Sequence, residues 1–536
     1  MKRIMVFMLG LLLGFKIVNS LLVPNWNYPM YAENEGIKLK SIVEKGNTDI
    51  DVFFLGTSHM EQGISPMVLY EKQKITGYNI ATGSQPIVGT YYIVKEMFKR
   101  GYNPKLIVLD VSNLFLQSTN EEGYRLITNN LKIDENLFGM ALEYSKIKDA
   151  NVTMQGFMTD MGSFMIPLIK YHDRWATLNV SDFKSNRNKK YFMQGYFNRP
   201  TIEASLANQE GVELVASWMI QNQSSQLNDE KDLSDDEWYI TEICDRNIYF
   251  IEKINLICKE NGCSLLLTKI PVMTFASDYS SSWSLPRYEC VKNLADQQGI
   301  IFWDLSFDAN IDLDWNHDTQ DGGRHLNLLG AEKVSTYIGE YIRENYDIPA
   351  QDNKSYENKL KLYREYSDIA HIEMSYNLVD YINKLKETDR ELYVFISAKD
   401  DMISGLSEEE IAKLNELGLK TNFSNIQYGY SFIGVINSGI SDFESASNRR
   451  LYYEISFAND TFEIFSAGYL DGNRSSILIN GIEYSMNSRG INFVVYDKKS
   501  GLIIDRAVCD TFTDEHEVIH KSDDLLYGFS EYLLDN

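Results

Sequence analysis

Two short segments far apart in the sequence carry side chains that could form a nucleophile and its general base. Residues 56–59 read Gly-Thr-Ser-His behind an apolar run, so Ser58 falls where a strand would turn into a helix. Residues 325–327 read His-Leu-Asn, and His325 is one of only seven histidines in the chain. Backbone N–H groups at a helix N-terminus can stabilise an oxyanion, and an imidazole can take the proton of a serine. Taken singly, Ser58 would be a helix cap and His325 a loop histidine; together they indicate acyl chemistry at a serine.

The elements that would position these residues alternate between strand and helix. The expected strands are residues 52–55, 78–80, 106–110, 264–269 and 300–304. The expected helices are residues 66–73, 90–100, 238–260, 287–298 and 328–345. Such alternation predicts an α/β fold in which helices cover both faces of a parallel sheet. Residues 115–235 form a mixed, polar insertion expected to cap the sheet and shape a substrate site, with His172 as a histidine that could line it.

A second domain follows a charged linker at residues 349–375. Strand-like runs between Leu392 and Tyr496 are separated by Asp-Gly and Asn-Gly pairs, which favour turns. Ser407 and Glu410 form a capping box before a helix at residues 407–417. This pattern predicts a β-rich domain over residues 376–515, followed by a tail at residues 516–536.

Composition limits the classes of partner. The net charge is −25, with 76 acidic and 51 basic residues, which argues against nucleic acid and favours a neutral or cationic partner. Five cysteines show no zinc-ligand spacing, so neither a structural metal nor a cofactor is expected.

The N-terminal segment has the pattern of a membrane-targeting sequence. Lys2 and Arg3 precede an apolar run, which weakens at Lys16 and Asn19 before residue 24. We expect residues 1–24 to form a single transmembrane anchor that holds the bulk of the chain outside the cytoplasm. The alternative is a signal peptide that is cleaved, so that the protein is secreted.

The strand-Gly-Thr-Ser-His segment and the late Asp-x-x-x-His-Leu-Asn-x-x-Gly-Ala-x-Lys element resemble the SGNH/GDSL hydrolase superfamily over residues 46–348. They look most like its membrane-anchored members of the DltD type, which modify envelope glycans and teichoic acids. The resemblance implies a flavodoxin-like sheet, Ser58 as nucleophile and His325 as base. The family's acid stands three residues before the histidine, where this chain has Gly322. Asp321 is the expected substitute, and Asp318 is the alternative.

The resemblance also implies an oxyanion hole. Its donors would be the backbone of Ser58, Gly83 after the second strand and Asn113 after the third. The family's Gly-x-Asn-Asp motif is absent, since the third strand runs instead into Asp-Val-Ser-Asn at residues 110–113. His59 and Arg324 are candidates for contact with substrate.

Residues 376–515 resemble the ILEI/PANDER domain. The similarity rests on the segments at residues 394–401, 431–434 and 488–497, the last with Arg-Gly-Ile-Asn, and on Asp-Thr-Phe at residues 510–512. The resemblance implies a compact β-sandwich with helices and a role in carbohydrate binding. Family cysteines that form disulfides are not evident in this chain.

Two functions follow from these observations. The first is an extracytoplasmic serine esterase or O-acyltransferase that modifies a cell-surface glycan or glycoconjugate, with a membrane-bound O-acyltransferase as a partner implied by the family. The second is a glycan-binding or assembly protein in which this fold has lost efficient catalysis. The displaced acid and the missing Gly-x-Asn-Asp motif favour the second, whereas Ser58 and His325 favour the first.

Overall fold

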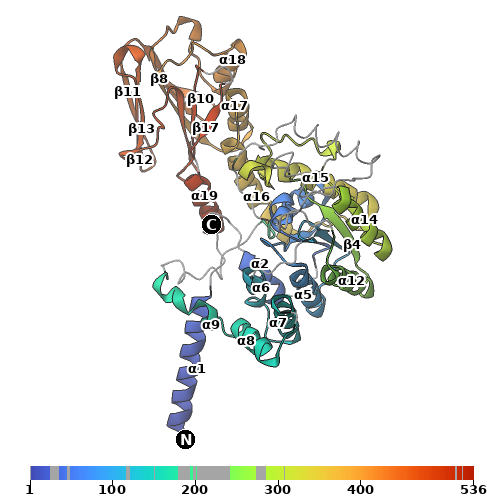
Figure 1. Cartoon of the computed structure of the whole chain (residues 1–536). Coiled ribbons are helices and arrows are strands. Elements are labelled where there is room, and N and C mark those ends of the chain that lie inside the picture. Colours follow the sequence, from blue (N-terminus) through green and yellow to red (C-terminus); the bar gives the residue numbers. More distant parts are fainter. Residues whose placement is uncertain are drawn as a thin grey trace, which may run out of the picture. The chain divides into compact units, whose positions relative to one another are not determined.

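The computed structural model divides the chain into two compact units, Met1–Leu360 and Lys361–Asn536 (Figure 1). The boundary lies within α16 (Lys354–Glu373), in the region expected as a linker. The structure describes residues 2–23, 35–44, 49–115, 121–149, 151–178, 193–196, 201, 242–272, 285–306, 308–512, 516–521 and 523–535. Much of the expected insertion, including most of residues 179–241, lies outside the described residues.

The first unit is built on a five-stranded parallel sheet, which confirms the predicted α/β class. Its strands lie in the order β2-β1-β3-β4-β5, the order of one common doubly wound sheet. The strands are β1 (Val52–Leu55), β2 (Gly77–Asn79), β3 (Leu106–Asp110), β4 (Ser264–Lys269) and β5 (Ile301–Asp304). Phe54 of β1 pairs with Asn79 of β2 on one side and with Val108 of β3 on the other.

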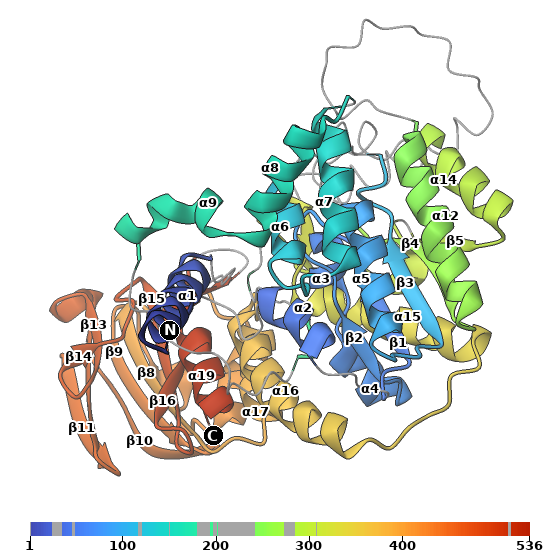
Figure 2. The same cartoon turned by 90° about the horizontal axis from the view of Figure 1, so that it is seen from below.

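Each central strand is apolar on both faces because helices cover both sides of the sheet. Phe53, Leu55 and Ile107 point into one core, and Val52 and Phe54 point into the other. The first core is covered by α5 (Ile87–Lys99), α12 (Asp245–Glu260) and α14 (Leu285–Gln298) (Figure 2). The second is covered by α3 (Ser58–Gly63), α4 (Pro66–Gln73) and α15 (Leu328–Asn345). Burial on both faces accounts for the continuous apolar runs in the sequence.

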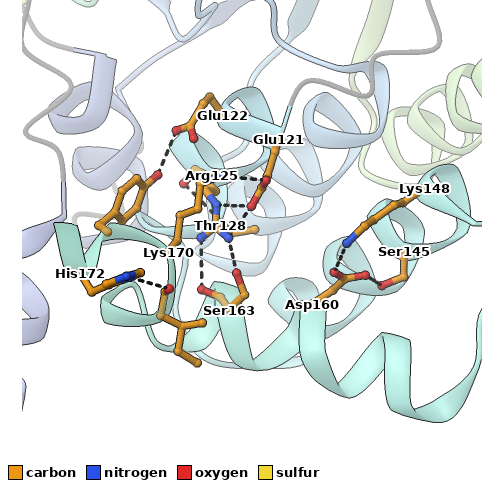
Figure 3. A network of polar contacts seen from close by, with 12 residues as sticks. Glu121, Glu122, Arg125, Thr128, Ser145, Lys148, Asp160, Ser163, Lys170 and His172 are labelled. Atoms are coloured by element: carbon orange, nitrogen blue, oxygen red, sulfur yellow. Dashed lines mark hydrogen bonds and ion pairs between the residues drawn. The ribbon is translucent and has the colours of Figure 1, made fainter. Parts of the chain in front are cut away.

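The described part of the insertion is helical. It contains α6 (Glu121–Thr128), α7 (Glu135–Lys148), α8 (Met154–Met165), α9 (Leu168–Tyr171) and the short η1 (His172–Ala176). Arg125 of α6 is buried and holds α8 in place, because its guanidinium donates to the Ser163 backbone oxygen at 3.1 Å and to Glu121 at 2.7 Å (Figure 3). The same group lies over the Phe164 ring, with 5.0 Å between the guanidinium carbon and the ring centre.

The N-terminal segment corrects one expectation. It forms α1 (Lys2–Leu22), but within the described residues no helix is long and apolar enough to cross a membrane. The prediction of a single N-terminal anchor, and of a location at the cell membrane, is therefore wrong. Lys16 and Asn19 interrupt the apolar run. Asn19 instead accepts a hydrogen bond from the Leu168 backbone at 2.8 Å, which attaches the end of α1 to α9.

The second unit confirms the β-rich character expected after the linker. Its strands form one ten-stranded sheet along the path β14-β13-β12-β8-β15-β16-β17, with β9 and β10 added beside β8 and β11 beside β12. The strands are β8 (Leu392–Asp400), β9 (Ser431–Asn437), β10 (Ile440–Ser447), β11 (Leu451–Phe457), β12 (Asp460–Gly468), β13 (Arg474–Ile479), β14 (Ile482–Glu483), β15 (Gly490–Asp497), β16 (Leu502–Cys509) and β17 (Val518–His520). The helices are α17 (Leu378–Glu387), α18 (Glu408–Leu417) and α19 (Asp523–Asp535).

Two local predictions in this unit can be compared directly with the structure. Ser407 and Glu410 form the predicted capping box at the start of α18. The residues expected as a tail are instead structural, because Val518 of β17 pairs with Cys509 of β16. The sheet therefore extends beyond the expected end of the domain.

Candidate active site

Ser58 begins α3, only two residues separate it from the end of β1, and a glycine makes this sharp turn possible. Gly56 has a φ of 139°, and a Cβ added there would lie 2.7 Å from the Cβ of Asp110 on β3. A side chain would thus be strained both by the backbone and by its neighbour. Thr57 caps the helix, since its hydroxyl accepts a hydrogen bond from the His59 backbone at 3.3 Å. The serine hydroxyl is thereby fixed at the carboxyl end of β1.

His325 reaches the same place from a tight loop near the end of the first unit. The loop comprises β6 (Thr319–Gln320), η5 (Asp321–Gly323) and β7 (His325–Leu326), and the two short strands pair antiparallel. Asp321, Gly322 and Gly323 have φ values of 47°, 71° and 88°. Aspartate and glycine are among the residues that tolerate this left-handed region. The turn also explains why glycine stands where an acid was expected.

The structure brings Ser58, His325 and Asp321 together as a linear chain of hydrogen bonds. His325 Nε2 lies 2.8 Å from Ser58 Oγ, and His325 Nδ1 lies 2.7 Å from Asp321 Oδ2. The other carboxylate oxygen of Asp321 accepts from the His325 backbone at 3.0 Å. Because the carboxylate can only accept from Nδ1–H, Nε2 is left to accept the serine proton. This arrangement can generate a serine nucleophile.

The histidine loop is attached to the nucleophile helix by buried amides. The Gln320 side chain donates to Gln62 of α3 at 2.7 Å and to the Leu326 backbone oxygen at 2.8 Å. The Asn327 side chain donates to the backbone oxygen of His317 at 2.6 Å and accepts from Gly330 at 3.2 Å. These bonds hold the base and the nucleophile at a fixed separation. Nothing in the sequence pattern pointed to the glutamine pair, because it joins distant segments.

Asp318, the alternative acid, has other partners. It lies 2.7 Å from Lys333 Nζ and accepts from the Asp314 backbone at 2.7 Å. Burial raises the pKa of Asp318, although the hydrogen bond from Lys333 acts in the opposite direction. These contacts tie the start of the loop to α15, while the carboxylate on His325 is that of Asp321.

The expected oxyanion donors have different surroundings. Gly83 is in the turn after β2, and the adjacent Thr82 donates to the Gly56 backbone oxygen at 3.2 Å, so the turn runs beside the nucleophile. Asn113 is buried after β3, and its side-chain amide donates to the Gln85 backbone oxygen at 2.8 Å. One of its two amide hydrogens is therefore already used to hold this turn. The second hydrogen is left to donate to an oxyanion, so Asn113 stays a candidate donor.

Asp110, which sequence reasoning did not select, organises both flanks of the nucleophile. It is fully buried at the end of β3, and its carboxylate accepts from the Thr57 hydroxyl at 3.0 Å and from the Ser112 hydroxyl at 2.7 Å. Ser112 in turn lies 3.0 Å from His59 Nδ1 and 3.2 Å from Lys269 Nζ. The sequence did carry a signal for this role, because a charged residue at the end of a buried, apolar strand must have polar partners.

The structure also shows where three further candidate residues lie relative to the triad. His59 lies beside the triad, with its ring centre 5.1 Å from that of His325. Arg324 is an exposed residue of the same loop. His172 is outside this site, since its ring contacts the Ile169 backbone oxygen at 3.3 Å and Asp173 at 3.1 Å (Figure 3).

The site lies where ligands bind in sheets of this class. β1 and β3 are neighbours and the chain order reverses there, and ligands of such sheets bind at the carboxyl ends of the strands on either side of this point. Within the part of the chain that the structure describes, no group of three His, Cys, Asp or Glu side chains could hold a metal ion. Comparison with protein-family models finds no match, and none of the curated proteins is significantly similar to this chain.

Proposed function

We propose that the chain is a serine ester hydrolase or O-acyltransferase of the SGNH type that acts on an acylated glycan. The observation that carries the proposal is the hydrogen-bonded sequence Ser58–His325–Asp321, at 2.8 and 2.7 Å. A serine and a histidine with purely structural roles would not be expected to form a hydrogen bond while a carboxylate binds the other nitrogen of the ring. A nucleophile, its base and the group that orients the base require this order.

The chemistry proceeds in two balanced steps. Ser58 Oγ attacks the ester carbonyl carbon while His325 Nε2 takes its proton, and collapse of the tetrahedral intermediate breaks the bond to the alcohol, which leaves with that proton. In the second step, a water or sugar hydroxyl attacks the acyl-enzyme and gives its proton to His325. Ser58 Oγ then leaves the acyl carbon and regains the proton. Asp321 holds the ring orientation throughout and stabilises the imidazolium.

Two further features support the SGNH class. The sheet order places the nucleophile after β1 and the base on a loop before α15, the last helix to cover the sheet. The helix N-terminus at Ser58 supplies backbone N–H groups to a developing oxyanion. These features belong to a flavodoxin-like domain that uses its strand ends for catalysis.

The second unit is proposed to be an ILEI/PANDER-like domain that retains the glycan. In the Arg-Gly-Ile-Asn segment, Asn492 closes a turn by donating to the Ser488 backbone oxygen at 2.8 Å, and Arg489 forms an ion pair with Asp510 at 2.8 Å. Two of the four segments on which the resemblance rests, residues 488–497 and 510–512, are thus neighbours in space. The sheet is mostly antiparallel.

A second candidate is a glycan-binding or assembly protein with weak catalysis. The absence of the family's Gly-x-Asn-Asp motif favours it, because that motif supplies an oxyanion donor. Loss of one oxyanion donor costs about 3 kcal/mol of transition-state stabilisation. Such a loss slows the reaction without removing the nucleophile.

Comparison of the wild type with Ser58→Ala tests the choice between them. We expect the wild type to hydrolyse an aryl acetate and to react with a fluorophosphonate probe, and we expect Ser58→Ala to do neither. Ser264→Ala is the matched control for the probe, since it removes an exposed serine hydroxyl at the start of β4, at the opposite edge of the sheet. Equal labelling of the wild type and Ser58→Ala would leave the binding protein as the better proposal.

A further inference from the structure

A second imidazole stands beside the triad and is held by a polar network of its own. The ends of β1, β3 and β4 bring together His59, Ser112, Asp110 and Lys269. Asp110 and Lys269 are buried, whereas His59 is partly exposed. Lys269 Nζ lies 3.2 Å from Ser112 Oγ and 3.2 Å from the Ile270 backbone oxygen. None of these groups has a step in the two-stage reaction above.

The hydrogen count of Ser112 fixes the tautomer of His59. A serine hydroxyl has one hydrogen to donate, and Ser112 gives it to Asp110 at 2.7 Å, because a carboxylate can only accept. Its oxygen then accepts from the Lys269 ammonium. The remaining contact, 3.0 Å to His59 Nδ1, must therefore have the ring nitrogen as donor. With Nδ1 carrying the hydrogen, Nε2 of the neutral ring carries a lone pair.

The electrostatic surroundings keep this ring neutral. Burial lowers the pKa of His59 well below its ordinary value, and the positive charges of Lys269 and of a protonated His325 act in the same direction. The Nε2 atom, on the ring side away from Ser112, makes no hydrogen bond to any residue that the structure describes. Among the described residues it is a hydrogen-bond acceptor without a partner, next to the base of the reaction.

The two imidazoles lie side by side, so one sugar can present a hydroxyl to each of them. The ring centres of His59 and His325 are 5.1 Å apart and the rings are inclined by 47°. In the acyl-enzyme, His325 Nε2 is free to accept from the attacking hydroxyl, as the mechanism requires. A neighbouring hydroxyl on the same sugar ring can donate to His59 Nε2 over a hydrogen bond of ordinary length. A water molecule has one oxygen and cannot occupy both positions.

We propose that His59 Nε2 binds the second hydroxyl of a vicinal diol, so that the acyl acceptor of this site is a sugar with adjacent free hydroxyls. The inference rests on the proposed function. The attacking oxygen forms the new ester bond and loses its proton to His325, while the hydroxyl on His59 stays intact. Asp110, Ser112 and Lys269 act as positioning residues that hold the acceptor tautomer. In the reverse direction, the same contact selects an ester whose neighbouring hydroxyl is free.

Product partition tests this inference. Wild-type enzyme is acylated with an aryl acetate in the presence of 1,2-ethanediol or of 2-methoxyethanol, in which one hydroxyl of the diol is methylated. The ratio of new ester to released acetate is measured for each. Per hydroxyl, we expect 1,2-ethanediol to give a ratio about five- to tenfold higher than 2-methoxyethanol does, which is the effect of one neutral hydrogen bond. His59→Asn, whose amide can still donate to Ser112 but has no group at the Nε2 position, should abolish the difference.

Two variants separate the lone pair from a structural effect. His59→Gln places an amide oxygen near the Nε2 position and should restore part of the preference for the diol. His172→Asn, at an exposed histidine outside this site, should keep the wild-type ratio. Equal transfer to both alcohols by the wild type, or an unchanged preference in His59→Asn, would overturn the inference alone. If no acyl group forms on Ser58, both the proposed function and this inference are wrong.

Discussion

At the scale of single residues, the account depends on which carboxylate touches His325. The sequence restricted the acid to two aspartates, and the loop geometry distinguishes them: Asp321 lies 2.7 Å from Nδ1, while Asp318 is paired with Lys333. The difference arises from a left-handed turn at residues 321–323. A turn of this kind changes which side chain faces the ring, so spacing to the histidine is a weak guide to the acid.

Asp321→Asn should slow turnover of an aryl acetate on the order of 10³-fold or more, because the amide can donate to Nδ1 and favour the wrong tautomer. Steady-state kcat with an aryl acetate measures the effect. Asp318→Asn is the matched control. It removes the charge that pairs with Lys333, so it should lower the melting temperature. It should leave kcat nearly unchanged. If the two variants were reversed in their effect on kcat, Asp318 would be the orienting acid.

At the scale of elements, the strand-to-helix turn at Gly56 decides whether Ser58 is in place. Gly56→Ala should destabilise the protein by about 3 kcal/mol, since the new Cβ would meet Asp110 in addition to adopting an unfavourable φ. Gly101→Ala is the control, because Gly101 also has a positive φ but no atom within 4 Å of its Cβ position. That change should cost about 1 kcal/mol. Denaturant unfolding of both variants gives the comparison, and equal losses would show that crowding at Asp110 is not important.

The last strand of the second unit carries a titratable anchor. Both ring nitrogens of His520 have acceptors, Asp505 at 2.9 Å and the Ser375 backbone oxygen at 2.8 Å. Burial by itself would lower the pKa of His520, but the charge and hydrogen bond of Asp505, with the bond to Ser375, raise it overall. Its stabilising contribution is thus complete below about pH 6.5 and is lost as the pH rises through the higher folded-state pKa.

The melting temperature of the second unit should therefore fall as the pH rises from about 6.5 through the folded-state pKa of His520. His520→Asn should remove most of this dependence of the melting temperature on pH. Thermal unfolding followed over this pH range measures it. A slope that is the same in the wild type and in His520→Asn would assign the pH dependence to other groups.

Much of the fold follows from the sequence because strands buried on both faces must be continuously apolar. Residues 52–55, 106–110 and 264–269 were identified to the residue for this reason. The contacts of Asp110 with Thr57 and Ser112 could not be predicted in the same way, since they require β1 and β3 to be neighbours. β16 lies beyond the strand-like runs expected up to Tyr496, although it pairs with β15 along most of its length. The N-terminal segment shows the opposite error, because an apolar run was taken for an anchor.

At the scale of the whole molecule, the chain consists of two units with separate cores. The second unit has its own sheet and an apolar core that includes Phe395, Val435 and Phe462. Residues 361–536 should consequently fold when produced alone, with one cooperative unfolding transition. Calorimetry or circular dichroism would detect it. A broad, non-cooperative transition would mean that this unit needs the first one in order to fold.

The central claim, that Ser58 becomes acylated with the help of His325, can be tested by trapping the intermediate. The full-length protein is mixed with an aryl acetate, quenched in acid within the first turnover, and its peptides are analysed by mass spectrometry. The account predicts one acetyl group on the peptide that contains Ser58, a burst of released phenol in the wild type, and loss of both in Ser58→Ala and His325→Ala. An acetyl group on a different residue, or a burst of the same size in Ser58→Ala, would contradict it.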